Sequence, residues 1–470
     1  MNGEENGDLP EGWASTALDE TGEWATGGTP SRKMPSYFGG TIPWIKSGDL
    51  NDGYVTRTDE SITFEGLNHS AAKLLPVGTL SVALYGATIG KLGILTIDAA
   101  TNQACANCII DTRLSSARFL FFYLLSQRRA LIEAGQGGAQ PNLSNALVRD
   151  WVIPLPPLAE QRRIVAAVEA LLARMNAARD RLNRVPAILK RFRQSVLSAA
   201  CSGRLTADWR VTETDCPDDD ELPAGWSIRP LSELCTRFEY GSSQKSQKSG
   251  RVPVLRMGNL QDGRIEWYDL VYTDDPKEIA KYRLSPNTVL FNRTNSPELV
   301  GKTSLFRGER EAVFAGYLIR VLTGSELDPH FLNYCLNAPS FKEFCLHVRT
   351  DGVSQSNINA QKLASYELNW CPVPEQQEIV RRVDALFALA DRIEAKLDAA
   401  RQRVESLTQS ILAKSFRGEL VPTEAELARR ENRSYEPAAD LLVRIRAERE
   451  RAAAQGKPAR SKRRSNDLSR

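Results

Sequence analysis

The strongest constraint on the fold is a run of apolar residues that occurs twice, 215 positions apart. Apolar side chains recur at alternating steps of four and three from Ile164 to Val196, and again from Ile379 to Ile411. All ten positions of each run are apolar. A 3.5-residue period sustained over this length is typical of helices that pair along an apolar seam. The sequence therefore predicts two long helices.

The two helical segments are copies of one another. Residues 156–205 and 371–420 align without a gap and share 15 identities in 50 positions, including Glu160-Gln161 against Glu375-Gln376. Self-similarity at one fixed offset indicates a duplicated unit, which argues against two unrelated helices packed on separate cores. We predict that the helices pair within one chain, along a seam formed by Ile164, Val168, Leu171, Met175, Leu182, Leu189, Phe192, Ile379, Val383, Leu386, Ile393, Leu397, Val404, Leu407 and Ile411.

A proline interrupts the first helical copy only. Pro186 lies in the middle of that copy, where Arg401 stands in the second. Because proline lacks a backbone N–H and its ring collides with the preceding turn, we expect it to kink the helix or to split it in two.

Each helical segment follows a region whose sequence predicts a globular domain with both strands and helices. Short strand candidates separated by Gly, Pro and Asn/Asp, with one helix near residues 116–134, indicate an α+β domain without regular βαβ alternation. The predicted organisation is a disordered N-terminus (1–12), a first recognition domain (13–155), a central helical spacer (156–205), an acidic linker (206–221), a second recognition domain (222–370), a distal helical spacer (371–422), and an amphipathic helix with a basic disordered tail (423–470).

Composition narrows the class of protein. Charged residues make up 25% and hydrophobic residues 42% of the 470 residues, as in an ordinary globular chain. No apolar run is long enough for a membrane span, and the first eight residues are polar, so we expect a cytoplasmic protein without a secretory signal. Cys105 and Cys108 have C-x-x-C spacing, but no second pair completes a zinc site, and buried thiols in a strand are expected instead.

Two glycine-lysine turns resemble phosphate-binding loops only in part. Gly86 to Lys91 is one residue short of the required spacing, and Ser296 to Thr303 lacks the first glycine. Because they occupy equivalent places in the two copies, a shared structural turn is the better interpretation. With three histidines in the chain and no catalytic constellation, no active site is predicted.

Several longer segments resemble a known family. Pro154 to Gln161, Ile188 to Leu197, Leu407 to Leu420 and the tail segment Ala438 to Arg446 closely resemble the DNA-specificity subunits of type I restriction–modification systems. The resemblance covers nearly the whole chain, including the openings Leu9-Pro-Glu-Gly-Trp13 and Leu222-Pro-Ala-Gly-Trp226. It implies two globular target-recognition domains, separated by long helices that pair as an intramolecular antiparallel coiled coil, with a pseudo-twofold internal repeat.

The resemblance also implies a function. Each recognition domain would read one half of an asymmetric, two-part double-stranded DNA site, and the helices would set the gap between the halves. The partners implied are two methylation subunits and the restriction (translocase) subunits, in the cytoplasm of a prokaryote. S-adenosylmethionine would belong to the methylation subunit, and ATP and Mg to the restriction subunit. This chain would hold no cofactor and no metal and would not itself be catalytic.

Candidate DNA-contacting residues are polar side chains on loops, because Arg, Lys, Asn and Gln read base edges and loops vary without disturbing a fold. In the first domain they are Thr29, Ser31, Arg32, Lys33, Tyr37, Lys46, Ser47, Asn51, Tyr85 and Lys91, and in the second Ser243, Gln244, Lys245, Arg256, Asn259, Gln261, Arg293, Asn295 and Lys302. For any one of them a structural role or a phosphate contact is an equal alternative. The loops with Gln140 and Asn142, and with Gln355 and Asn357, recur in both copies, which favours a structural role.

Two rival functions stay open at this point. A duplicated coiled-coil scaffold that binds only protein would show the same helices without reading DNA. A self-contained restriction–methylation enzyme would need a methyl-donor domain or a nuclease carboxylate cluster, and the chain leaves no room for either.

Overall fold

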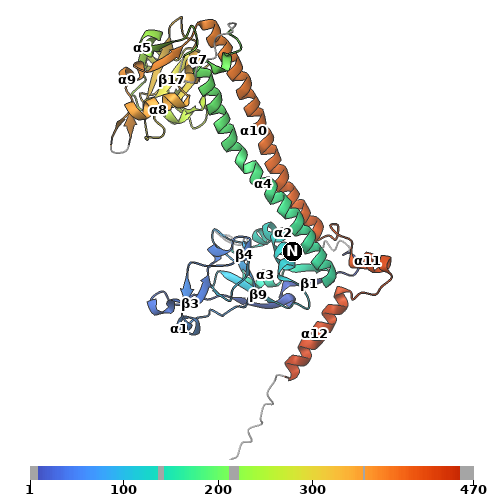
Figure 1. Ribbon diagram of the computed structural model, residues 1–470. Coiled ribbons are helices and arrows are strands. Elements are labelled where there is room, and N and C mark those ends of the chain that lie inside the picture. Colours follow the sequence, from blue (N-terminus) through green and yellow to red (C-terminus); the bar gives the residue numbers. More distant parts are fainter. Residues whose placement is uncertain (1–8, 136–141, 211–221, 353–354, 456–470) are drawn as a thin grey trace, which may run out of the picture. The chain divides into compact units, whose positions relative to one another are not determined.

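The computed structural model describes residues 9–135, 142–210, 222–352 and 355–455 (Figure 1). The chain divides into two compact units, one made of residues 1–180 with 401–470 and one of residues 181–400. The first unit therefore combines the two ends of the chain, whereas the second is continuous in sequence. The predicted basic tail, the N-terminal eight residues and Gln140 lie outside the described residues.

The first unit is built on a five-stranded mixed sheet in the order β2-β9-β6-β7-β4. A three-stranded sheet, β5-β3-β8, and a two-stranded pair, β1-β10, complete it. The strands are β1 (Ala14–Ala17), β2 (Gly22–Thr26), β3 (Phe38–Ile45), β4 (Gly53–Val55), β5 (Ser61–Ile62), β6 (Leu80–Ala83), β7 (Leu92–Leu95), β8 (Ala100–Thr101), β9 (Cys105–Ile110) and β10 (Val152–Leu155).

The second unit repeats the order of the five-stranded sheet, the three-stranded sheet and the terminal strand pair, and adds β14 and a further three-stranded sheet. Its main sheet has the order β12-β21-β17-β19-β15-β14, and the smaller ones are β16-β13-β20, β18-β23-β22 and β11-β24. The repeat predicted from the helices thus extends to the globular domains. The strands are β11 (Ser227–Pro230), β12 (Cys235–Tyr240), β13 (Val252–Leu255), β14 (Leu260–Gln261), β15 (Gly263–Ile265), β16 (Val271–Thr273), β17 (Thr288–Asn292), β18 (Thr294–Asn295), β19 (Thr303–Phe306), β20 (Val313–Phe314), β21 (Leu318–Thr323), β22 (Thr350–Asp351), β23 (Ser356–Asn357) and β24 (Glu367–Trp370).

Helices cover these sheets and link them. The predicted helix near residues 116–134 is α2, whose first turn is capped by the Ser116 hydroxyl, which accepts a hydrogen bond from the Phe119 amide. The helices are α1 (Phe64–Asn68), α2 (Ala117–Ala134), α3 (Asn145–Arg149), α4 (Leu158–Cys201), α5 (Leu231–Leu234), α6 (Pro276–Tyr282), α7 (Pro329–Cys335), α8 (Pro339–Val348), α9 (Ala360–Ala364), α10 (Val373–Ser415), α11 (Glu424–Glu431) and α12 (Ala438–Gln455). The sequence predicted α2, α4, α10 and α12, but not the shorter helices α1, α3, α5 to α9 and α11.

The two long helices, α4 and α10, pack together and run antiparallel, as predicted. In the first unit Arg179 pairs with Glu405 at 3.1 Å, and Arg163 pairs with Glu424 beyond the end of α10. In the second unit Arg193 pairs with Asp391 at 2.8 Å, and the Leu205 carbonyl accepts a hydrogen bond from Arg382. The residue numbers thus rise along one helix where they fall along the other. Each unit therefore contains the start of one helix beside the end of the other.

Two predicted seam positions are wrong. Ile393 and Leu407 are 39% and 45% exposed, so neither is enclosed between the helices. Val383, Ala390 and Leu397 of α10, spaced by seven residues, are buried.

Pro186 does not split α4, contrary to one of the two expected outcomes. The helix is a single element from Leu158 to Cys201 with Pro186 inside it. A proline removes one hydrogen bond, to the carbonyl of Leu182, but leaves the remaining turns intact. Val196, on the C-terminal side of the proline, is buried in the core of the second recognition domain.

The C-terminal helices pack on the first recognition domain. Leu441, Leu442 and Ile445 of α12 are buried in the same apolar core as Trp13 and Phe119. Residues 9–12, which the sequence placed in the disordered N-terminus, form a turn, in which Trp13 N donates to the Pro10 carbonyl. The Gly12 carbonyl accepts from Ala438 N, so the beginning and the end of the described chain meet in this unit.

The C-x-x-C thiols are buried, as predicted. Cys105 and Cys108 both lie in β9, and burial raises the pKa of each thiol to about 12. Within the described ranges there is no group of three or more His, Cys, Asp or Glu side chains placed to hold a metal. None of the described helices has the length and apolar character needed to cross a lipid bilayer.

Candidate nucleic-acid interface

The start of each long helix is fixed by a buried carboxylate. Glu160 accepts hydrogen bonds from the Trp13 indole at 2.8 Å and from Glu424 N at 2.8 Å. Burial raises its pKa, since these donors only partly replace water. The tryptophan of the repeated Leu-Pro-x-Gly-Trp opening is therefore joined to the repeated Glu-Gln pair.

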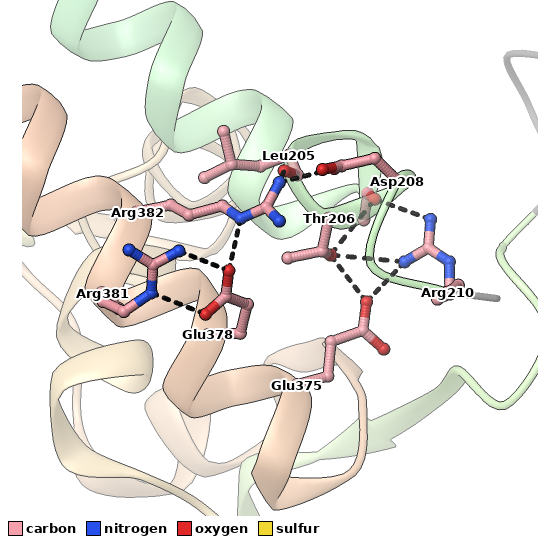
Figure 2. Close-up of polar contacts among 9 residues, drawn as sticks. Leu205, Thr206, Asp208, Arg210, Glu375, Glu378, Arg381 and Arg382 are labelled. Atoms are coloured by element: carbon pink, nitrogen blue, oxygen red, sulfur yellow. Dashed lines mark hydrogen bonds and ion pairs between the residues drawn. The ribbon is translucent and has the colours of Figure 1, made fainter.

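The second copy builds the same contact with more donors. Glu375 accepts a hydrogen bond from the Trp226 indole at 3.0 Å. It also accepts from the Thr206 hydroxyl at 2.6 Å and from the Arg210 guanidinium, as Figure 2 shows. In both units, the segment that follows one long helix thus reaches the start of the other. These contacts hold each recognition domain on the helices, and sequence reasoning noted both motifs without linking them.

The neighbouring glutamines complete this anchor. Gln161 donates to the Leu114 and Pro156 carbonyls, and Gln376 donates to the Glu326 and Cys371 carbonyls, all at 2.7–3.0 Å. The equivalent side chains make equivalent bonds, so the Glu-Gln pair has a structural role in each copy.

In the first unit, three loops leave the main sheet at one end. β2 and β6 both run antiparallel to β9, with Thr26 opposite Ala106 and Ala83 opposite Cys105. The loops after β2 and β6 and the loop before β9 are therefore neighbours, and the Thr29 hydroxyl contacts the Gln103 amide oxygen. Gln103 was not among the predicted residues.

The candidate cations of this end share one carboxylate. Glu60 pairs with Lys46 and Arg32, each at 2.7 Å, and these hydrogen bonds lower the pKa of Glu60. The Arg32 guanidinium also lies 4.4 Å from the centre of the Phe38 ring. The two cations come from different loops, after β2 and after β3, and Lys33 beside Arg32 is exposed.

The remaining candidates of the first unit have varied surroundings. Tyr37 stacks on His69, and Asn51 donates to the Asp49 carbonyl at 3.2 Å. Tyr85 is exposed, and its backbone bridges Asn142, which supports the structural role predicted for that loop. Ser47 and Lys91 are half-buried.

The equivalent end of the second unit carries a tyrosine–arginine cluster. Arg293 lies 4.5 Å from the centre of the Tyr240 ring, and its amide donates to the Tyr317 carbonyl at 3.0 Å. Because β12 and β17 both run antiparallel to β21, the loops carrying these residues meet at one end of the sheet. Tyr240 and Tyr317 are exposed, and no sequence signal distinguished them from other aromatic residues.

Beside this cluster, Ser243, Gln244 and Lys245 are exposed on the loop after β12. The Asn295 amide oxygen accepts from Ser296 N at 2.8 Å, which leaves its NH₂ group available. The backbone of Asn357 pairs with Thr294 between β18 and β23, again a structural role for the repeated loop, while Gln355 beside it is exposed.

The candidates near residue 260 are used within the domain. Asn259 is 2% exposed, and its side chain bonds Arg256 N and the Glu266 and Tyr268 carbonyls. It therefore has no free group for DNA, a correction to its choice as a contact residue. Arg256 pairs with Asp269 at 3.1 Å. The Lys302 ammonium donates to the Gln261 side chain at 2.7 Å.

The glycine-lysine turns have the same geometry in both units. Gly90 N donates to the Ala83 carbonyl and Gly301 N to the Asn292 carbonyl, at 2.8 and 2.9 Å. Both glycines have positive φ, 73° and 89°, which favours glycine. Equal hydrogen bonding at equal places agrees with the shared structural turn predicted from the sequence.

The chain contains two similar domains, and each carries a group of polar loops at one end of its sheet. Each domain is held on paired helices. These features define a recognition scaffold with two binding domains. A family described as the type I restriction modification DNA specificity domain matches the chain twice, over residues 10–186 and 223–400. The chain belongs to this family of type I restriction–modification DNA-specificity subunits.

Characterised relatives and solved structures resemble the chain over most of its length. It is 30% identical over 472 residues to the EcoKI specificity subunit of Escherichia coli K12, covering 97% of this chain and 99% of the relative. It is 31% identical over 460 residues to the StySPI specificity subunit of Salmonella potsdam, covering 94% and 96%.

Among solved structures, the HsdS subunit of Thermoanaerobacter tengcongensis superposes with a TM-score of 0.55 at 21% identity, covering 88% of this chain and 99% of that one. A chain from a study of complex assembly and conformational transition of the type I R-M system gives a TM-score of 0.64, also at 21% identity and with the same coverage. At this identity the likeness concerns the fold.

Proposed function

We propose that this chain selects the DNA sequence for a type I restriction–modification complex. Each recognition domain reads one half of an asymmetric two-part site in double-stranded DNA, and the paired helices set the distance between the halves. The observation that carries the proposal is the duplication itself. Five strands of the main sheet follow the same order in both units, whereas the loops at the end of each main sheet carry different side chains.

The proposed reading residues are exposed or half-buried polar side chains of these loops. In the first unit they are Arg32, Lys33 and Tyr85, with Lys46 held beside Arg32 by Glu60. In the second unit they are Ser243, Gln244, Lys245, Arg293 and Asn295. Arg and Lys suit guanine and Asn and Gln suit adenine, so each set can discriminate bases in a major groove.

The chain acts by binding and scaffolding. Methylation subunits dock on the helices and carry the methyl-donor chemistry with S-adenosylmethionine, and restriction subunits supply ATP-driven chemistry with Mg. This division of labour fits the side chains described. The buried carboxylate of Glu160 accepts hydrogen bonds from the Trp13 indole and the Glu424 amide, and that of Glu375 accepts them from Trp226, Thr206 and Arg210.

A domain exchange tests the proposal. Residues 13–155 are replaced by the equivalent segment of a relative with a known target, and methylated adenines are mapped across a host genome. One half of the recognised sequence should change and the other half should stay. An unchanged target, or methylation by the purified chain alone with the methyl donor, would overturn the proposal.

A second measurement separates DNA reading from a protein-only scaffold. Specific binding of the assembled complex should weaken steeply as salt rises, because phosphate contacts release counterions. Leu171→Asp or Leu386→Asp should disrupt assembly under either function, so these variants serve only as assembly controls.

A further inference from the structure

The second unit contains a cavity of about 360 Å³ between the two long helices and the recognition domain. Every residue that lines it lies within residues 181–400, so one compact unit builds the whole cavity. Its walls come from α4, from α10, from α7 and from the turn before β15, and Arg307 after β19 and Lys342 of α8 complete them. Cavities of this size suit small organic molecules.

One wall of the cavity is aromatic. The ring of Tyr334 packs edge-on against that of Phe387, with 5.8 Å between the ring centres. Tyr334 is 6% exposed, and its hydroxyl donates a hydrogen bond to Asp384, which holds the ring in place. Pro186 of α4 lines the same cavity with a rigid apolar ring. Flat surfaces of this kind pack well against a planar ring of a ligand.

Five cations line the cavity, and three of them are unpaired. Arg193 pairs with Asp391 and with Glu394, both at 2.8 Å. Arg264 also pairs with Asp391, at 3.0 Å. The side chains that make no hydrogen bond or ion pair with another described residue are those of Lys190, Arg307 and Lys342.

The unpaired cations outnumber the carboxylates that could balance them. Of the two carboxylates that line the cavity, Glu394 is already paired with Arg193, and Asp262 has no partner cation among the described residues. Burial and the hydrogen bond to Asp384 raise the pKa of Tyr334, and the positive charges of Arg307 and Arg264 oppose that rise. The cavity therefore favours an anion.

The first unit carries other side chains at the equivalent places. At the 215-residue offset, Lys190 corresponds to Glu405 and Phe387 to Leu172. Glu405 pairs with Arg179 at 3.1 Å, so a paired carboxylate stands where the second unit has an unpaired cation. The duplicated helices thus differ in charge and in aromatic character at this cavity.

The cavity is not an extension of the loops proposed to read DNA. Arg307 directly follows β19, whose last residue, Phe306, lies opposite Thr288 at the start of β17. The proposed reading residues Arg293 and Asn295 follow the other end of β17. Arg307 and these reading residues therefore lie at opposite ends of the main sheet.

The chemistry of the walls selects the class of ligand. An inorganic phosphate ion would satisfy the cations but would leave the aromatic wall facing water. An uncharged ring would cover that wall but would leave three cations without a partner. A nucleoside diphosphate satisfies both, because its base can pack on the rings of Tyr334, Phe387 and Pro186 while its phosphates meet the unpaired Lys and Arg side chains.

We propose that this cavity binds one nucleoside diphosphate, with the base against the aromatic wall and the phosphates on Lys190, Arg307 and Lys342. Such a ligand touches α4, α10 and the recognition domain at once, and so holds the second domain against its helices. The site belongs to this chain alone and does not depend on the proposed reading of DNA.

Equilibrium dialysis of radiolabelled ADP and UDP against the full chain, assembled with its methylation subunits, tests the proposal. Saturating S-adenosylmethionine keeps the adenine of ADP out of the methyl-donor site. One nucleotide should bind per chain, and Lys190→Ala with Lys342→Ala should weaken binding by about tenfold or more, because two phosphate contacts are lost. The matched control, Arg184→Ala with Arg191→Ala, removes two exposed cations of α4 that do not line the cavity and should leave binding unchanged.

Filling the cavity provides the second arm. Gln194 is half-buried and lines the cavity from α4, and Gln194→Trp should abolish binding without changing the charge of the site. Thermal melting should confirm that each variant folds. Photolabelling with an azido derivative of ADP should mark a peptide of α4, α7 or α10 within residues 181–400 of the unaltered chain.

No binding of either nucleotide, an equal loss in the control variant, or a label in the first unit would overturn the inference. Equal competition by inorganic phosphate or by DNA without the target would also overturn it, since the cavity would then take only phosphate. Sequence-specific DNA binding is measured on the same samples. Normal specific binding without bound nucleotide contradicts only this inference, whereas loss of specific binding by the unaltered complex contradicts the proposed function.

Discussion

The indole of Trp13 donates a 2.8 Å hydrogen bond to the carboxylate of Glu160, 147 positions later in the chain. The same pair recurs as Trp226 and Glu375 at 3.0 Å. A short opening motif in each copy is thereby fixed to the first turn of a long helix. The charge beside the two carboxylates differs: Arg210 pairs with Glu375, whereas no cation among the described residues is bonded to Glu160.

Removing the indole donor should therefore harm the first unit more than the second. Trp13→Phe leaves a buried carboxylate oxygen without a donor and should cost about 1–3 kcal/mol. Trp226→Phe should cost less, because Arg210 still neutralises Glu375. Hydrogen exchange resolved by unit measures both. Equal losses would show that the cation beside Glu375 contributes nothing.

The raised pKa of Glu160 gives this contact a pH dependence. A carboxyl whose pKa is raised by folding binds its proton more tightly when folded. Its contribution to stability is fully present below the unfolded pKa and is lost as pH rises through the folded pKa. Trp13→Phe should shift that loss to higher pH, as followed by hydrogen exchange of the first unit across a pH series.

Glu378 should titrate far into acid. Hydrogen bonds from Arg381 and then Arg382 lower the pKa of this carboxyl to about 2 (Figure 2). Its ionised form is favoured by folding above the unfolded pKa, and this effect disappears only as pH falls through about 2. Carbon-13 NMR of labelled glutamate side chains measures it. In Arg381→Ala the value should rise, and an unchanged titration would show that Arg381 does not act on Glu378.

Pro186→Ala should stabilise the helix around it. Alanine restores the N–H that can reach the Leu182 carbonyl, and the intrinsic cost of proline inside a helix is about 3 kcal/mol. Because the native backbone has already adapted to the ring, the expected gain is about 1–2 kcal/mol. Chemical denaturation of the second unit, followed by exchange at α4, measures the change. Destabilisation would mean that the proline ring packs better than a methyl group.

Variants of Asn259 and Gln244 should distinguish a structural role from a role in DNA recognition. Asn259→Ala removes three buried hydrogen bonds and should lower the stability of the second domain without changing its target sequence. Gln244→Ala, on an exposed loop, should leave stability unchanged and alter binding to one half of the site by about 1–3 kcal/mol if it reads a base. Denaturation and competition binding with single-base variants report the two effects.

The α12 helix should be needed for the first recognition domain. Leu442→Asp places a charge in the core that α12 shares with Trp13 and should release the helix from that domain. Val443→Asp, one residue away and exposed, is the matched control. Faster exchange in β2 and β9 with the first variant only is the expected result. Unchanged exchange in both would show that α12 adds nothing to this domain.

The helices and the repeat could be predicted from sequence because both depend on periodicity. The 3.5-residue spacing and the offset between Ile164 and Ile379 can be recognised even though the loops of the two copies differ in sequence. The end of α2 at Ala134 was also predicted. The exposure of Ile393 could not be predicted, since a heptad pattern gives the apolar positions but not how closely two helices approach.

The candidate reading residues show where sequence reasoning stops. Asn259 and Gln244 are both amide side chains near a predicted turn, yet one is buried and the other exposed. Which of them is enclosed depends on β14 and β15 folding back over η5 (Met257–Asn259), a tertiary contact that leaves no local pattern. The hydrogen bond between Trp13 and Glu160 had a signal in the sequence, because both motifs occur in both copies. Their contact could not be predicted, because the two residues lie at opposite ends of the domain in sequence.

The division of the chain into one continuous and one split unit has a consequence for its synthesis. The core of the first unit includes Leu412 and Ile445, whereas the second unit lies wholly within residues 181–400. At about 5–20 residues per second, a ribosome needs a further interval of roughly ten to fifty seconds to add the 220 intervening residues and then the closing helix. The recognition domain that is translated first therefore completes its fold last. In a nascent chain its apolar surface stays exposed to solvent until the C-terminal helices leave the ribosome.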